Sequence, residues 1–432
     1  MSNTTPALLR PVDIINAGLA RRRTAERRFR FYGLAAISLA LIFLALLFVS
    51  IVGKGYTAFW QTEIRLDVTL SPDLLGIAEP GDRGQIMAAN YNAVIKAALR
   101  QAFPDVQDRA EQRQLFALVS GGAEDILRRR LLNDASILGQ TLSLWVPAGS
   151  DIDMVQKGHI DRNLPENQRR VSDQELAWVD ALARQDRIEQ RFNGDFLASG
   201  DSRSPEQAGV WGAVVGSFLT LAVTMLLSFP LGAAAAVYLE EFAPKNRFTD
   251  IIEVNINNLA AVPSIVFGLL GLAVFINAFG LPRSSPLVGG LVLTLMTLPT
   301  IIIASRAALK SVPPSIREAA LGIGASPLQT VTNHVLPLAM PGMMTGMIIG
   351  MARALGETAP LLMIGMVAFI VDVPKGIFDP ATALPVQIYL WADSPEMGFA
   401  ERTSAAIIVL LVFLLSMNAL AVVVRRRFER RW

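Results

Sequence analysis

Residues 311–342 read "SVPPSIREAALGIGASPLQTVTNHVLPLAMPG", and this stretch decides the fold because it places local structure between two long apolar segments. Ser315, with Glu318 three residues later, indicates one helix start. Ser326, with Gln329 at the same spacing, indicates a second. The "LGIGA" between them contains glycines that permit a sharp turn. The simpler alternative is an ordinary loop, but loops seldom contain two capped helices, so we predict a helix-turn-helix.

The chain around this stretch is too apolar for an ordinary soluble domain. Of its 432 residues, 52% are hydrophobic and only 18% are charged, and the mean hydropathy is +0.42. Apolar runs of about 20 residues are candidate membrane spans. Such runs cover residues 31–53, 210–239, 257–279, 286–304, 338–370 and 403–424. We therefore expect an all-α polytopic membrane protein with six transmembrane helices.

Arginine-rich tails indicate how these spans are threaded. "RRRTAERRFR" (21–30) precedes the first span and "RRRFERRW" (425–432) follows the last. Because basic residues collect on the cytoplasmic side, tails 1–30 and 425–432 are both expected there, together with loop 311–337. The first span, 31–53, is longer than the apolar part of a signal peptide and no cleavage site follows it, so it is expected to be an uncleaved anchor.

Residues 54–207 differ in character, because they are rich in charge and contain no spanning run. Ser172 and Glu175 have capping-box spacing ahead of a helical pattern. "TLSLWVP" (141–147) alternates like a strand, and "FNGDF" (192–196) suggests a hairpin turn. We expect a helix-rich α+β domain outside the membrane, inserted between spans one and two. Its role is not indicated by any set of residues in it.

Several chemistries are excluded by what the chain lacks. It has no cysteine and only two histidines, so no disulfide, thiol nucleophile, metal site or cofactor site is expected. It also has no G-x-x-x-x-G-K-[ST] phosphate-binding loop. The chain is therefore expected to be no enzyme, and a partner ATPase must supply any nucleotide-driven work.

Two opposite charges lie in the fifth span, within "GMARALGETAPLL" (350–362). Arg353 and Glu357 are four residues apart and share a helix face. An arginine at the middle of a bilayer costs about 2.5 to 3.5 kcal/mol on insertion scales, so something must compensate it. The pair is either a structural lock between helices or the lining of a solute path. We favour a path in which Arg353 meets an anion and Glu357 holds the guanidinium when the anion is absent, with Thr358 beside them.

The same span carries small residues at four-residue intervals, which are Gly342, Gly346, Gly350 and Ala354. Such a stripe allows another helix to approach closely, so we predict a packing face here. Pro360 is expected to bend the helix just beyond Glu357.

The loop between the fourth and fifth spans resembles the EAA loop of ABC importer permeases. That pattern is EAA, three residues, Gly, nine residues and Ile-x-Leu-Pro, with His334 here in place of the isoleucine. The matching residues are Glu318, Ala319, Ala320, Gly324, Leu336 and Pro337. The resemblance implies that the short helix of the loop docks into a groove on an ATP-hydrolysing subunit and transmits its closure to the spans.

Three further stretches resemble the phosphate importer permeases of the PstA type. They are "AAVPSIVFGLLGL" (260–272), "LTLMTLPTIIIASRAALKSVP" (293–313) and "ARALGETAPLL" (352–362). The likeness covers residues 209–432 well, giving a permease core at 209–424, and covers the first span loosely. It does not reach 54–207.

This resemblance implies an ABC importer permease fold in a bacterial inner membrane. The implied partners are a second permease of the PstC type, two copies of an ABC ATPase and a periplasmic phosphate-binding protein. Two alternatives stay open. The solute could be another oxyanion, such as sulfate or molybdate, or the chain could be a membrane-anchored sensor or scaffold.

Overall fold

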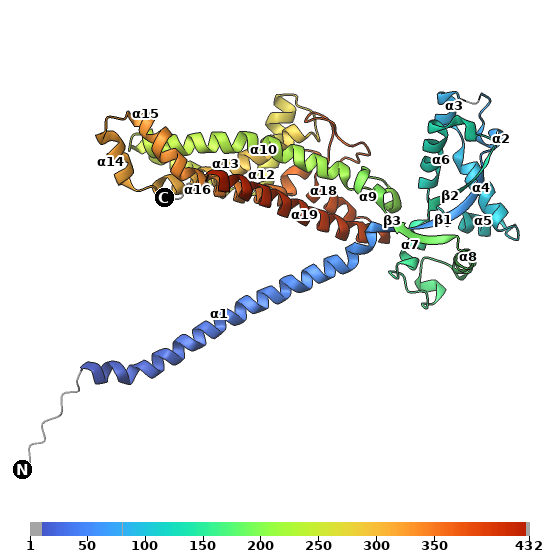
Figure 1. Ribbon diagram of the computed structural model, residues 1–432, viewed down its shortest axis with the longest axis horizontal. Helices are drawn as coiled ribbons and strands as arrows, with labels where there is room; N and C mark the ends of the chain where they lie inside the picture. Colours follow the sequence, from blue (N-terminus) through green and yellow to red (C-terminus); the bar gives the residue numbers. More distant parts are fainter. Residues whose placement is uncertain (1–10, 80, 429–432) are drawn as a thin grey trace, which may run out of the picture. The chain divides into compact units, whose positions relative to one another are not determined.

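The computed structural model describes residues 11–79 and 81–428, and most of them are helical (Figure 1). They fall into two compact units, one ending at Lys54 and the other beginning at Gly55. In the described residues the first unit is helix α1 (Pro11–Gly55) up to Lys54, and it contains the expected anchor and the basic run before it. Residues 1–10 and 429–432 of the two expected basic tails lie outside the described residues.

The second unit begins with an antiparallel sheet. Its order is β2 (Thr141–Pro147), β1 (Trp60–Thr69) and β3 (Ile188–Phe192), with β1 paired on both sides. Alternate residues of β1, such as Ile64 and Leu66, face a hydrophobic core. The strand expected at 141–147 is confirmed.

Helices pack around this sheet over residues 72–198, and Ser172 and Glu175 form the expected capping box at the start of one of them. The expected hairpin turn at 192–196 is wrong. The Asn193 side chain accepts a hydrogen bond from the backbone N–H of Phe196, so Asn193 caps a helix instead of turning a hairpin. The helices are α2 (Pro72–Leu75), α3 (Arg83–Ala88), α4 (Tyr91–Ala102), α5 (Arg109–Ala117), α6 (Gly122–Asn133), α7 (Ser150–Gln156), α8 (Asp173–Arg184) and α9 (Gly194–Ala198). Single 3₁₀ turns are η1 (Tyr56–Phe59), η2 (Ala135–Ile137), η3 (Glu166–Gln168) and η4 (Pro205–Gln207).

Long apolar helices follow and form the rest of the unit. Among the described residues, five helices including α1 are long and apolar enough to cross a membrane, and the bent pair α11 and α12 makes a sixth candidate. The long helices after α1 are α10 (Trp211–Val237), α13 (Pro286–Lys310), α16 (Leu336–Gly356) and α19 (Met397–Phe428). α10 packs on α13, α13 on α16, and α16 on α19. The expected architecture of several long apolar helices with an inserted α+β region is confirmed.

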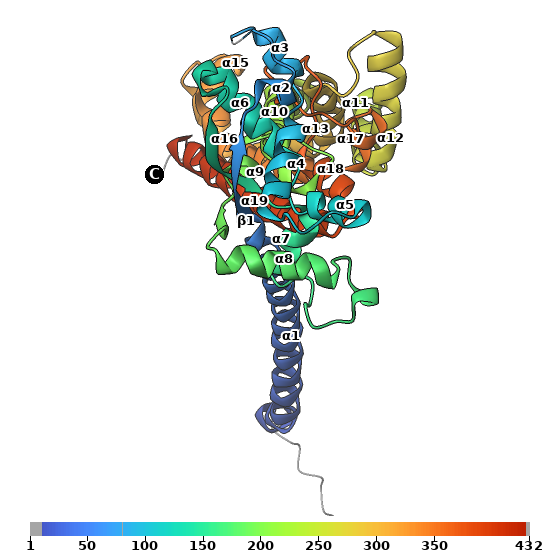
Figure 2. The ribbon, with the colours of Figure 1, turned by 90° about the vertical axis from the view of Figure 1, so that its right-hand side faces the viewer.

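The third expected span, 257–279, is not a single straight helix. α11 (Arg247–Ala260) ends before Pro263, and α12 (Ser264–Leu270) begins after it at an angle of 103° to α11. Proline disfavours helical backbone in the residue before it, which explains a break at this place. A π-helical segment, η6 (Gly271–Ala278), continues α12. Figure 2 shows α11 and α12 in yellow at one margin of the core.

The fifth expected span, 338–370, also ends early. α16 stops at Gly356, and Glu357 has extended backbone with φ −82° and ψ 121°. Pro360 lies in the first turn of the short helix α17 (Ala359–Met363) instead of bending a continuous span. The apolar residues beyond it, including Ile364 and Met366, leave the helix and fold into the core.

The helix-turn-helix is present between α13 and α16. Its second start is confirmed, because Ser326 and Gln329 form a capping box before α15 (Pro327–Gln329). The start expected at Ser315 is wrong: α14 (Pro314–Gly322) begins two residues earlier than a cap at Ser315 implies, with Pro313 in the N-cap position. Gly324 has φ +92°, which agrees with the expected glycine turn. The remaining elements are the π-helical segments η5 (Tyr238–Phe242) and η7 (Thr330–Val335) and the helix α18 (Leu384–Ala392).

A third hydrophobic cluster joins the inserted region to the helical core. From the inserted region it contains Ala58 and Phe196, and from the core it contains Leu384, Trp391 and Phe399. The indole Nε1 of Trp391 also donates a hydrogen bond of 2.9 Å to Asp201. The inserted region is therefore packed against α18 and the first turns of α19.

Candidate functional site

The charged pair of the fifth span lies where α16 ends. Arg353 is in the last turn of the helix, and Glu357 follows it directly. Arg353 Nε is 3.7 Å from Glu357 Oε1, and the side chains are 41% and 21% exposed. This ion pair is long, and both of its side chains are partly exposed. Thr358 follows Glu357 and precedes the first residue of α17, so the three residues expected on a solute path lie in one short stretch.

Another side of α16 is pressed closely against α13. A Cβ atom at Gly342 would lie 2.6 Å from Cβ of Ala308, and one at Gly346 would lie 2.4 Å from Cβ of Ala304. A Cβ at Gly350 would lie 3.4 Å from Ile301 Cγ1, and Ala354 is buried in the core. The two helices approach this closely because their contact residues are small. α13 thereby fixes the helix that carries Arg353.

The helix-turn-helix presents an exposed surface that combines acidic and apolar side chains. Glu318 and Ala319 are exposed on α14, whereas Ala320 is buried beneath them. Leu336 and Pro337 are the first two residues of α16, where the loop ends. Large apolar side chains are exposed around the glycine turn, namely Leu321 (49%), Ile323 (83%) and Leu328 (62%). Apolar side chains exposed together in this way are typical of a surface that binds another protein.

A groove runs beside this surface, between the start of α14 and the start of α16. Its volume is about 610 Å³, and its walls include Ile316, His334 and Pro341. His334, which departs from the EAA pattern, therefore lines a surface groove and is not buried inside the loop.

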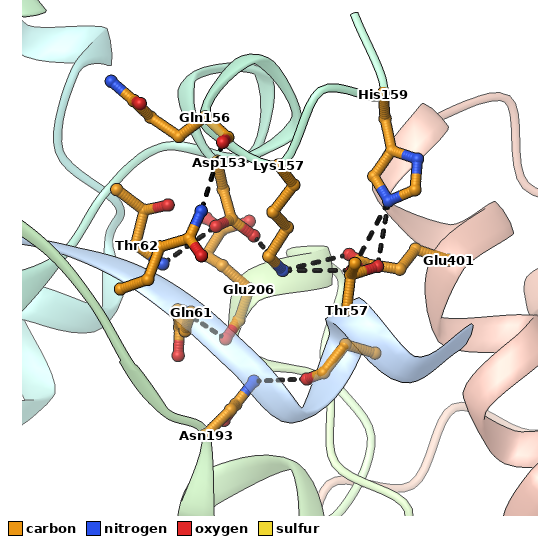
Figure 3. Close-up of polar contacts among 12 residues, drawn as sticks. Thr57, Gln61, Thr62, Asp153, Gln156, Lys157, His159, Asn193, Glu206 and Glu401 are labelled. Atoms are coloured by element: carbon orange, nitrogen blue, oxygen red, sulfur yellow. Dashed lines mark hydrogen bonds and ion pairs between the residues drawn. The ribbon is translucent and has the colours of Figure 1, made fainter. Parts of the chain in front are cut away.

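A second charged cluster was missed by the sequence analysis and lies where α7 meets α19 (Figure 3). Lys157 Nζ is 2.7 Å from Asp153 Oδ2 and 3.1 Å from Glu401 Oε1. These three side chains are 1%, 4% and 3% exposed, respectively. His159 lies at the margin, with Nε2 at 2.9 Å from Thr57 Oγ1.

Arg402 lies next to this cluster and is 1% exposed. Its Nη1 donates to the backbone carbonyl of Ala58 at 3.0 Å, and its guanidinium lies over the ring of Phe196. The signal in the sequence is the pair of adjacent charges at 401–402, immediately before the run 403–424. This pair alone does not predict the cluster, because charged residues beside a membrane span are common. Its partners are also more than 200 residues away in the sequence.

Burial also raises the pKa of two carboxyl groups near the contact between the inserted region and the helical core. Burial raises the pKa of Glu206 above its usual value, and the hydrogen bond that its Oε1 accepts from Ser120 at 2.7 Å offsets this only in part. Burial likewise raises the pKa of Asp201, against the hydrogen bond from Trp391.

Comparison with known families places both parts of the chain. Residues 228–432 match the family "Binding-protein-dependent transport system inner membrane component". Residues 16–166 match a "Domain of unknown function (DUF3333)".

Individual relatives agree with the first of these matches. The chain is 32% identical over 239 residues to the probable ABC transporter permease protein YqgI of Bacillus subtilis, covering 52% of this chain and 81% of that protein. It is 33% identical over 230 residues to the phosphate transport system permease protein PstA 1 of Mycobacterium tuberculosis, covering 52% and 74%.

A solved structure of the MetNI methionine ABC transporter in an inward-facing conformation aligns with 51% of this chain and 98% of its own, at 19% identity and a TM-score of 0.41. The family rests on the sequence matches. The chain belongs to the binding-protein-dependent transport system inner membrane components, and it is an ABC importer permease of the PstA type.

Proposed function

We propose that this chain is a permease subunit of an ATP-driven phosphate importer and that Arg353 contacts the anion during passage. One observation carries the proposal: Arg353 keeps 41% of its side chain exposed although the helix around it is apolar. A guanidinium in such a helix is costly and is usually retained for a function. The relatives named as phosphate transport permeases support phosphate as the solute.

The geometry suits a residue that is neutralised in the resting state and free to bind an anion. Glu357 lies 3.7 Å from Arg353, close enough to compensate its charge but too far for a strong hydrogen bond. An incoming phosphate would offer oxygens to the planar guanidinium, which forms short, charge-assisted hydrogen bonds with phosphate. Thr358 would contribute a hydroxyl group beside the same path.

The partners follow from the same proposal. A second permease of the PstC type would complete the path, and a periplasmic phosphate-binding protein would deliver the solute. Two copies of an ABC ATPase would supply the energy, one of them docked on loop 311–337 of this chain, where Glu318, Ala319 and the apolar residues around Gly324 are exposed. This chain itself would hydrolyse no nucleotide.

The domain organisation is part of the proposal. Residues 31–53 would anchor the chain, 54–207 would lie outside the membrane, and 209–424 would form the permease core. Both tails and loop 311–337 would then be cytoplasmic, in agreement with the arginine bias of 21–30.

The proposal is tested by phosphate uptake into proteoliposomes that contain the whole complex. Because a hydrogen bond to a charged group is worth about 1.5 to 3 kcal/mol, Arg353→Gln should lower uptake about tenfold to a hundredfold. Arg426→Gln, an exposed arginine at the end of α19, is the matched control and should leave uptake unchanged.

A double variant separates the two roles of the pair. The double variant Arg353→Gln with Glu357→Gln leaves no unpaired acid. If the pair were purely structural, uptake should therefore survive its removal. Continued loss of uptake in the double variant supports contact with the anion, whereas restored uptake contradicts it. Unlabelled sulfate or molybdate that competes as well as phosphate would assign a different oxyanion.

A further inference from the structure

Within the helical core, α10 ends on the side where α14 and α15 lie (Figure 1). Two adjacent acidic residues follow that end. α10 finishes in the π-helical turn η5, which contains Glu240 and Glu241. π-helical turns are rare in proteins, and those that occur often lie at functional sites. The two side chains are only 18% and 8% exposed, so each carboxylate requires a partner to offset its loss of water.

Glu241 is held by Arg317, which lies in α14, the helix of the EAA motif. Arg317 Nη2 is 2.6 Å from Glu241 Oε1, and Nε is 3.2 Å from Oε2, so the contact has two points. The same guanidinium donates to the backbone carbonyls of Leu309 at 3.0 Å and Val312 at 2.8 Å. These carbonyls lie at the C-terminal end of α13. One side chain of α14 therefore holds the ends of both α10 and α13, using a fork of donors that lysine lacks.

Glu240 extends this connection to another helix. Arg306 of α13 lies 3.3 Å from Glu240 through Nε and 2.6 Å from Glu253 of α11 through Nη2. The side chain of Arg306 is 16% exposed. The adjacent Glu240 and Glu241 after α10 are thus paired with side chains of α13 and α14, and Arg306 extends the contacts to α11.

We propose that Arg317 and Glu241 are positioning residues that carry movement of α14 to α10 and α13 during transport. The inference rests on the proposed function, because it takes an ATPase docked on α14 as the source of that movement. Arg317 points inward to the core while Glu318 and Ala319 are exposed on the same helix. A docked motor would therefore act on the outer side of α14, and Arg317 would pass the displacement inward. Without the link, α14 could move with the motor while α10 stayed in place.

The test compares phosphate transported per ATP hydrolysed in proteoliposomes that hold the intact complex. We expect Arg317→Gln, Arg317→Lys and Glu241→Gln each to lower this ratio about tenfold, within the range of coupling between two protein sites. The ATPase subunit should still co-purify, and basal ATP hydrolysis should persist. Arg247→Gln, an exposed arginine at the start of α11, should keep the normal ratio.

A covalent replacement of the ion pair makes the test independent of charge. The chain has no cysteine, so Glu241→Cys with Arg317→Cys gives this subunit its only two thiols. Joining them with a bis-methanethiosulfonate reagent of matching length should restore the ratio, and cleaving the tether with reductant should lower it again. A tether that restores nothing overturns the inference.

Other outcomes are equally decisive. A normal ratio in both Arg317→Gln and Glu241→Gln overturns the inference and leaves the proposed function intact. Parallel loss of hydrolysis and transport, at an unchanged ratio, assigns the pair a structural role and also overturns it. A wild-type complex that contains no ATPase subunit contradicts the proposed function instead.

Discussion

At the scale of single residues, Arg402 is the side chain whose replacement should affect stability most. It is 1% exposed, and its charge interacts electrostatically with the buried acids Asp153 and Glu401, which Lys157 also contacts. Removing one member of a buried ionic group leaves the others uncompensated, at a cost of about 3 to 5 kcal/mol. We expect Arg402→Met to lower the unfolding temperature of the purified complex clearly, while Arg247→Met at an exposed position should not. Equal unfolding temperatures for the two variants would show that the cluster does not need its guanidinium.

Glu206 leads to a prediction about pH. Burial raises the pKa of its carboxyl group above 4.5 in the folded protein, so the folded state binds this proton more tightly than the unfolded state. The carboxyl therefore weakens folding as pH rises from about 4.5 through the raised pKa, and has no such effect below that window. Glu206→Gln removes the ionisation but keeps an acceptor for Ser120.

The measurement is the unfolding temperature across a pH series for wild type and Glu206→Gln. The variant should gain stability relative to wild type as pH rises through the window, and the difference should vanish below about pH 4.5. Parallel curves over the whole series would mean that the carboxyl group of Glu206 does not ionise differently in the two states.

At the scale of elements, the glycine turn after α14 provides a matched pair of substitutions. Gly322 and Gly324 both have open space where a Cβ atom would be added, but only Gly324 has a positive φ, of +92°. Alanine at such a φ costs about 1 to 2 kcal/mol, whereas alanine at the helix end costs nothing comparable. Gly324→Ala should therefore reduce phosphate-stimulated ATP hydrolysis by displacing the loop, and Gly322→Ala should not. Equal ATP hydrolysis in both variants would show that the conformation of the glycine turn is not needed for coupling.

The elements also show which signals a sequence carries locally. The capping boxes at Ser172 and Ser326 were predictable because each is complete within four residues. The start at Ser315 was misplaced because the two prolines before it already fix the helix start without a side-chain cap. The bend at Pro263 and the end of α16 at Gly356 were missed because an apolar run shows only that residues are buried, not that the chain between them is straight.

The candidate site shows the same limit. Arg353 and Glu357 were recognisable as an isolated pair of charges in an apolar run, and the EAA loop by its spacing. The pairs Arg317–Glu241 and Arg402–Ala58 were not, because each joins segments 76 or 344 residues apart. Only folding brings such residues together, and the periodicity of a single sequence does not predict contacts between distant segments.

At the scale of the whole molecule, the inserted region is structurally part of the permease in the described residues from Gly55 onward. Phe196 shares a hydrophobic cluster with Trp391, near the end of α18, and Phe399, at the start of α19. Asp201 accepts a hydrogen bond from Trp391. Lys157 of the inserted region forms ion pairs with its neighbour Asp153 and with Glu401 of α19. A region joined by a flexible linker would share no such core, so movement of the inserted region is expected to reach α19 directly.

Deleting residues 60–205 with a short linker tests this integration and the threading of the chain together. The apolar runs on either side are unchanged, so the shortened chain should still insert, with its C-terminus on the same side as in wild type. The cluster around Trp391 and Phe399 would lose Phe196, and each large apolar side chain left exposed costs about 1.5 to 3 kcal/mol. The variant should therefore insert normally but unfold at a lower temperature and assemble poorly with its partners. A fused reporter on the opposite side of the membrane would contradict the six-span threading, whereas full stability with correct insertion would show that the inserted region is an independent appendage.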